Sequence, residues 1–169
     1  MDQYTSMLHD ITENKMIQEG LLGRFLPIIQ SVAKEALKRY STSESVLQAP
    51  HLCILERSAI LALCKFMCVS SVICIENMDL LFDLVQSNIE FGVKANIIIT
   101  LADLFNRFPN NMNERVKDIF MLLHDKEVHV RQQALMVITH LILNDMLKLK
   151  GEIVDICMML EDPDDRIKD

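Results

Sequence analysis

Four basic residues recur every 37 positions along this chain of 169 residues: Arg57, Lys94, Arg131 and Lys168. Lysine and arginine make up only 17 of the 169 residues, so a column of four cations at one spacing is difficult to explain by chance. Self-similarity at such a period is typical of stacked helical repeats, whose units bury their apolar faces only against their neighbours. The period therefore predicts an all-α helical solenoid.

Apolar residues follow each of the first three basic residues at offsets of 3, 4, 7, 10 and 11. These offsets lie on one stripe of an α-helix, so each unit is predicted to contain a helix with one buried face. Half of the chain is apolar, so this stripe is weaker evidence than the basic column. The residues predicted to line one continuous core are Val93, Ile98, Leu101, Leu135, Ile138 and Leu141. On this prediction, Leu135→Ala should cost about 2–5 kcal/mol of stability.

Composition agrees with a helical protein in a reducing compartment. Only four glycines, four prolines and no tryptophan occur, which favours helix over sheet or disorder. The five cysteines lie mostly in apolar runs without a preceding secretory signal, so we expect them to be reduced and packed in the core. The net charge of −7 argues against a nucleic-acid footprint over the whole surface. Charged residues interrupt the apolar run 52–75, which argues against a transmembrane helix.

Turn and cap residues divide the chain into predicted helices. Residues 1–20 are poorly assigned and weakly helical, whereas residues 21–169 are predicted to form one repeat solenoid with a linker near 41–49. The chain stops at Asp169 within what should be the next helix, so we expect it to be truncated at the C-terminus, with an exposed apolar strip there. The predicted helices span residues 4–19, 21–40, 50–69, 77–86, 90–108, 113–123, 125–143 and 149–161, and a last one begins at Pro163 after an Asp162 cap.

Several runs resemble a known family of helical-repeat proteins. They are DLFNRFPN at 103–110, THLILNDM at 139–146, KLKG at 148–151, ALCKFMCVSS at 62–71 and LLGRF at 21–25. Together these runs are similar to the HEAT-repeat subunits of condensin, strongly from about residue 52 and more weakly from residue 21. Residues 1–20 carry none of the resemblance. Ala102, where this family usually has glycine, and the segment 41–50 depart from its pattern, which indicates a divergent member.

The resemblance implies a scaffold without catalytic, cofactor-binding or metal-binding residues. Such subunits grip the kleisin subunit, touch an SMC subunit and help to hold DNA during the condensation of mitotic chromosomes. The implied location is the nucleus and the chromosome, with the cytoplasm outside mitosis, and no membrane or small-molecule substrate is implied. Two alternatives stay open: a HEAT-repeat adaptor of another system such as nuclear transport, and a HEAT-like metal-dependent enzyme. Such enzymes use paired His-Glu motifs, and no His-Glu dipeptide occurs in this sequence.

In HEAT-type repeats, a basic residue at the start of the second helix commonly pairs with an acid in the turn of its own or the next repeat. Asp125 and Asp162 stand six residues before Arg131 and Lys168, where such turns are expected. We therefore interpret the basic column as a structural repeat ladder, comprising Arg57, Lys94, Arg131 and Lys168.

Lys148 and Lys150 differ from that column because they fall in a turn between helices, beside Gly151. Lysines in a turn reach a phosphate backbone as mobile point charges, so this turn is the candidate contact with DNA or a partner. A merely solvated turn is an equally good interpretation.

Three other groups of residues resemble metal or catalytic sites but have simpler interpretations. His140 has no metal-ligand type at the helical positions around it, so a capping or interhelix hydrogen bond is expected. Cys64 and Cys68 share a helix face without a second pair, which favours core packing over zinc. The acidic run 161–165 precedes a helix, where carboxylates complement the helix dipole.

Overall fold

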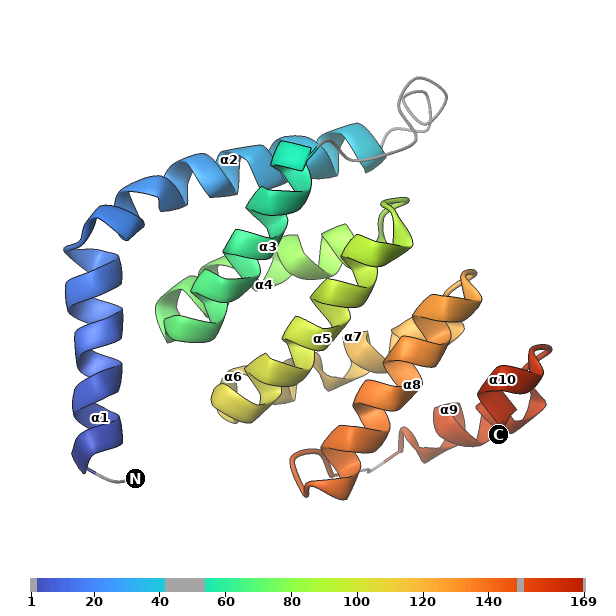
Figure 1. Ribbon diagram of the computed structural model, residues 1–169. Helices are drawn as coiled ribbons and strands as arrows, with labels where there is room; N and C mark the ends of the chain where they lie inside the picture. The colour runs from blue at the N-terminus through green and yellow to red at the C-terminus, as the bar shows by residue number, and fades with distance from the viewer. Residues whose placement is uncertain (1–2, 42–53, 149–150, 169) are drawn as a thin grey trace. The chain divides into compact units, whose positions relative to one another are not determined.

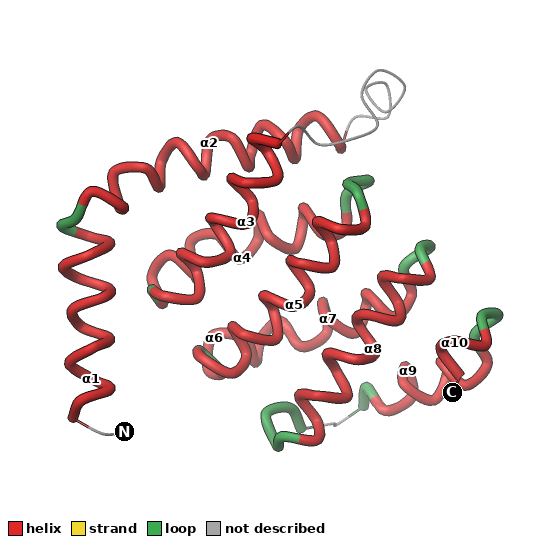
Figure 2. The backbone as a smooth tube through the Cα atoms, in the orientation of Figure 1, coloured by secondary structure: helices red, strands yellow, loops and turns green. Residues whose placement is uncertain are grey.

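The computed structural model describes residues 3–41, 54–148 and 151–168, and these residues contain helices and no strand (Figures 1 and 2). The prediction of an all-α HEAT-repeat fold is confirmed. The linker predicted near 41–49 lies outside the described residues apart from Ser41. The elements in chain order are α1 (Gln3–Asp10), the π-type helix η1 (Ile11–Gln18), α2 (Leu21–Ser41), α3 (Ile54–Val69), α4 (Ser71–Gln86), α5 (Phe91–Arg107), α6 (Pro109–Met112), η2 (Asn113–Arg115), α7 (Val116–Met121), η3 (Leu122–His124), α8 (Val128–Leu143), α9 (Ile153–Met158), η4 (Met159–Glu161) and α10 (Asp165–Lys168).

The chain divides into two compact units, Met1–Leu80 and Leu81–Asp169, and the boundary falls within α4. In the first unit, the main packing is that of α2 against α3. An ion pair supports it, because Arg39 on α2 lies 2.7 Å from the buried carboxylate of Glu56 on α3. The hydroxyl of Ser70 donates a 2.7 Å hydrogen bond to Glu13, which ties η1 to the start of α4.

Gly20 and Gly23 allow the chain to turn closely between η1 and α2. A Cβ added to Gly23 would overlap the carbonyl of Ile17, and one added to Gly20 would overlap that of Met16. Any larger residue would force the two helices apart, so the glycines explain why the bend lies at this point.

In the second unit, α5 packs against α8, and the two helices run side by side (Figure 1). The apolar positions at offsets 7 and 10 after the basic residues are fully buried in both helices: Leu101 and Leu104 in α5, and Ile138 and Leu141 in α8. The equivalent residues of α3, Cys64 and Met67, are also buried within the first unit. The repeat frame read from the sequence therefore describes the core of each helix.

Leu135 is an exception to the predicted core. The other predicted members are buried, whereas Leu135 is half-buried, as is Ile142 about two helical turns further on. Their counterparts in α5, Ile98 and Phe105, are fully buried. Burial is lower on α8 because α10, which comes later in the chain and packs against α8, has only four residues. The expected cost of Leu135→Ala is accordingly smaller than the sequence predicted.

Three helix starts differ from those predicted. Helix α4 begins at Ser71 rather than Asn77, because Ser70 acts as its cap: the Ser70 hydroxyl accepts the N–H of Ile73 at 3.5 Å. The helix after 90–108 was predicted to begin at residue 113, but α6 begins at Pro109, since proline at the first helical position loses no hydrogen bond. Pro163 lies in a turn, and α10 begins at Asp165.

Candidate functional site

Arg131, on the first turn of α8, forms a buried ion pair with Asp162 in the turn before α10. Its Nε lies 2.8 Å from Asp162 Oδ2, and its Nη2 lies 2.9 Å from Oδ1. The two side chains are only 10% and 4% exposed. Arg131 Nη1 also donates to the carbonyls of Asp125 and Lys126, at 3.0 and 3.3 Å. The guanidinium thus has four acceptor contacts, which is how a buried cation is stabilised.

The turn around Asp162 orients its carboxylate toward Arg131. Asp162 Oδ1 accepts the backbone N–H of Asp164 at 2.9 Å, as in an Asx turn. The hydrogen bond from Arg131 lowers the pKa of the Asp162 carboxyl below its usual value, aided by the Asp164 N–H and by the charge of Arg131, while burial acts in the opposite direction. The same hydrogen bond raises the pKa of Arg131. The pair is therefore ionised at neutral pH.

Lys94 and Asp125 form the equivalent pair one repeat earlier. Lys94 lies on the first turn of α5, and its Nζ is 3.4 Å from Asp125 Oδ2. The side chains are 9% and 16% exposed. The other oxygen, Oδ1, accepts the N–H of Glu127 at 2.8 Å, so Asp125 adopts the same turn geometry as Asp162.

Both pairs join a cation to the acid 31 residues later, which belongs to the turn of the next repeat. Of the two partners that the sequence allowed, the structure uses the next repeat rather than the cation's own. Lys168 behaves differently and lies 2.9 Å from Asp165 on its own short helix. Arg57 is half-buried on α3 in the first unit.

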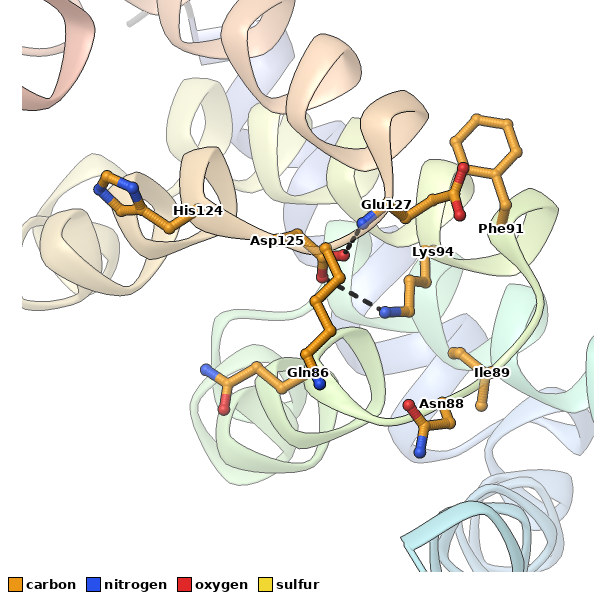
Figure 3. A pocket seen from close by; sticks show the side chains of 9 residues that line it. Gln86, Asn88, Ile89, Phe91, Lys94, His124, Asp125 and Glu127 are labelled. Atoms are coloured by element: carbon orange, nitrogen blue, oxygen red, sulfur yellow. Dashed lines mark hydrogen bonds and ion pairs between the residues drawn. The ribbon is translucent and has the colours of Figure 1, made fainter. Parts of the chain in front are cut away.

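A cleft of about 480 Å³ opens at the Lys94 pair, between the start of α5 and the turn that precedes α8 (Figure 3). Nothing in the sequence reasoning pointed to it. Its lining combines two amides, two lysines, two carboxylates, an imidazole and apolar side chains, from Gln86, Asn88, Ile89, Phe91, Lys94, His124, Asp125, Lys126 and Glu127. The ring of Phe91 lies 5.1 Å from that of His129 on α8, which fixes one wall.

His124 forms a contact that sequence reasoning missed. Its Nε2 lies 3.2 Å from Asp155 Oδ1 on α9, and both side chains are partly exposed. A cleft of about 410 Å³ adjoins this contact, lined in part by Phe120 and Met121 of α7. The signal was present in the sequence, because Asp155 is also 31 residues after His124, but a single His–Asp spacing has no specificity by itself.

Lys148 follows the end of α8, where the chain closes in a Schellman motif. The N–H of Met146 donates to the carbonyl of Leu141 at 2.9 Å, and Asp145 adopts a left-handed φ of 57°. Lys148 is exposed and lines a cleft of about 690 Å³ together with Lys117 and three carboxylates, those of Glu114, Asp145 and Glu152. Lys150 lies outside the described residues.

The remaining sequence candidates lie apart from these clefts. His140 is exposed beside the amide of Asn144, whose Nδ2 donates to the His140 carbonyl at 2.7 Å. Cys64 is buried and Cys68 is half-buried, and burial raises the pKa of the nearby Cys74 thiol to about 11. In the acidic run, Asp164 accepts the N–H of Arg166 at the start of α10. Within the described ranges, no group of three or more His, Cys, Asp or Glu side chains is placed to hold a metal ion.

Among the helices in the described parts of the chain, none combines the length and the apolar character that crossing a bilayer requires.

Comparison with known proteins gives one consistent family. A family model described as "non-SMC mitotic condensation complex subunit 1" matches residues 92–169. The Arabidopsis thaliana protein named condensin-1 complex subunit CAP-D2 is 41% identical over 113 residues, which cover 67% of this chain and 8% of that protein. The Homo sapiens condensin complex subunit 1 is 35% identical over 167 residues, which cover 98% of this chain and 11% of that protein.

A yeast relative extends the similarity over the whole chain. The Saccharomyces cerevisiae condensin complex subunit 1 is 28% identical over 170 aligned positions, which cover 99% of this chain and 14% of that protein. The chain therefore spans about a tenth of the length of the curated relatives that it matches.

Proposed function

Because this chain belongs to the condensin subunit 1 family, we propose that it acts as a non-catalytic HEAT-repeat scaffold in chromosome condensation. Its partners in this proposal are the kleisin and SMC subunits of condensin, and it works on chromosomes in the nucleus. We assign it no catalytic residue, cofactor or metal. The observation that carries the proposal is the match of the family over residues 92–169, the region that contains both buried ion pairs and α5, α8 and α9.

The architecture supports a scaffold role in physical terms. Stacked helices present an extended surface of side chains, and such a surface suits an extended peptide. The two buried pairs hold α5 and α8 each to the turn of the following repeat. Such links resist movement of one repeat against the next. The family match favours condensin over a nuclear-transport adaptor, which was the alternative within the same fold.

A binding experiment tests the proposal. The purified chain is offered immobilised kleisin segments and SMC heads, with a basic nuclear-localisation peptide as the transport-type competitor. We expect the chain to be retained by a kleisin or SMC fragment and not by the basic peptide. Retention by the basic peptide alone would contradict the proposal and favour the transport adaptor.

We further propose that Lys148 and Lys150 contact the DNA phosphate backbone within the assembled complex. Three carboxylates line the cleft beside Lys148, so we expect the isolated chain to bind duplex weakly. In the complex, Lys148→Glu/Lys150→Glu should weaken binding equally for all DNA sequences. It should also reduce the slope of log K against log salt by about 1.8, since each phosphate contact contributes about 0.9.

A matched control has the same change of charge at exposed lysines elsewhere. Lys34→Glu/Lys65→Glu places two carboxylates on α2 and α3, in the first unit, and should leave the slope unchanged. If the variant at Lys148 and Lys150 has the same slope as this control, the turn is a solvated connection and takes no part in DNA binding.

A further inference from the structure

The two equivalent cations of the second unit are satisfied to very different degrees. The Arg131 guanidinium has two contacts to Asp162 and two to backbone carbonyls, all between 2.8 and 3.3 Å. Within the described residues, the Lys94 ammonium has one hydrogen-bond partner, Asp125, at the longer distance of 3.4 Å. Yet Lys94 is equally buried, with 9% of its side chain exposed against 10% for Arg131.

Lys94 has fewer acceptor contacts than Arg131 because the two side chains differ in chemistry. The arginine fork reaches the carbonyls five and six residues before it, and the lysine ammonium does not reach the corresponding carbonyls of Ile89 and Asn88. An ammonium has three N–H donors, so two of those on Lys94 are left for other acceptors. A buried cation with unused donors is costly unless an acceptor is supplied.

The unused donors face the cleft of about 480 Å³ described above. Figure 3 shows the Lys94 side chain extending between Asp125 on one side and Asn88 and Ile89 on the other. A second cation, Lys126, also lines this cleft, beside the carboxylates of Asp125 and Glu127. At about 480 Å³, the cleft is large enough for one or two side chains of another molecule.

We propose that this cleft binds an acidic peptide segment, with a Glu or Asp carboxylate on the Lys94 ammonium and an apolar side chain beside it. The positive end of α5 favours an anion, because Lys94 stands in the first turn of a helix of 17 residues. The amide of Asn88 can donate to the same carboxylate, and Ile89 and Phe91 provide the apolar wall. Asn88 occupies the repeat position at which Asp125 and Asp162 carry a negative charge, so this side of the cleft has an amide in place of a carboxylate.

The charge balance favours a single carboxylate over a nucleic-acid backbone. Lys94 and Lys126 are opposed by Asp125 and Glu127 in the lining, which gives no net positive charge. A polyanion gains most of its affinity from many phosphate contacts, which this cleft lacks. This peptide site is defined by the geometry of the chain alone and stands independently of the assignment to condensin.

The chain itself offers a discriminating variant. Lys94→Arg copies the arrangement at Arg131, in which the guanidinium donates to the paired Asp and to two backbone carbonyls. We expect this variant to raise the midpoint of thermal unfolding by about 2–4 °C and to lose the acidic peptide. A substitution that stabilises the protein and removes binding separates a ligand site from a merely structural pair. Asn88→Ala changes an exposed side chain and should weaken binding without changing stability.

The probes are the peptides acetyl-Gly-Glu-Leu-Gly-amide and its Gln counterpart, titrated into the isotope-labelled chain and followed by NMR. The Glu peptide should shift the amides of Gly92 and Lys126 and bind at least tenfold more tightly than the Gln peptide. Equal affinity for the two peptides would overturn the proposal, as would undiminished binding by Lys94→Arg. An unperturbed spectrum at millimolar peptide would overturn it as well. None of these results bears on retention by kleisin or SMC fragments, so the two proposals fail separately.

Discussion

Replacing Arg131 by methionine is expected to destabilise the protein by about 3–5 kcal/mol, because it leaves the carboxylate of Asp162 buried without its counter-charge. That carboxylate is 4% exposed, so water cannot take the place of the guanidinium without opening the turn before α10. Urea unfolding followed by circular dichroism measures the effect. The matched control is Arg166→Ala, which removes an exposed pair with Asp164 and should change the stability far less.

A double variant separates the ion pair from the loss of packing. Arg131→Met/Asp162→Leu removes both charges, and we expect it to regain most of the stability that Arg131→Met loses. The pH dependence provides a second check. The Arg131 hydrogen bond lowers the pKa of Asp162 in the folded state, so the contribution of this pair is present above the unfolded value of about 3.9 and is lost as the pH falls through the folded value. The double variant should therefore lose less stability than the native protein below about pH 4. Equal losses in the two proteins would show that Asp162 does not carry the effect.

Leu101→Ala is expected to cost about 2–5 kcal/mol, because Leu101 is fully buried on α5, a helix that packs against α8 in the second unit. The control lies in the same repeat frame. Leu135 on α8 is half-buried, and its truncation should cost about half as much, since less apolar surface is removed from contact. Thermal unfolding of the two variants under one condition gives the comparison. If Leu135→Ala proved as costly as Leu101→Ala, α8 would have to be more deeply covered than the structure describes.

The 37-residue period could be read from the sequence because the second helix of each repeat packs in the same way. Residues at the same offsets from the basic residue are therefore buried. Leu101 and Ile138 are equivalent in the frame and equally buried. Ile98 and Leu135 are also equivalent in the frame but differ in burial, because burial depends on the neighbouring element as well as on the helix itself. The period predicts which positions of the helices are equivalent, but it carries no information on how the neighbouring elements differ from one repeat to the next.

The starts of helices were harder to predict, because caps act through single hydrogen bonds. Ser70 directly follows the predicted helix 50–69, and it also caps the next helix, since its hydroxyl accepts an N–H of α4. The acidic partner of Lys94, which is Asp125, could not be assigned from the sequence either, because an acid in the same repeat or in the next was possible. The different numbers of contacts made by Lys94 and Arg131 become visible only when both pairs are placed in space.

Asp125 belongs to both ion-pair systems, since its carboxylate meets Lys94 and its backbone carbonyl accepts from Arg131. One turn therefore couples a repeat to its predecessor and also anchors the start of its own second helix. In a linear array of repeats, cooperativity depends on how large such nearest-neighbour terms are relative to the stability of each repeat alone. Because Asp125 takes part in both contacts, a change that weakens one of them is expected to weaken the other. Helices α5 and α8 should for this reason open as one unit in amide hydrogen exchange, and not one after the other.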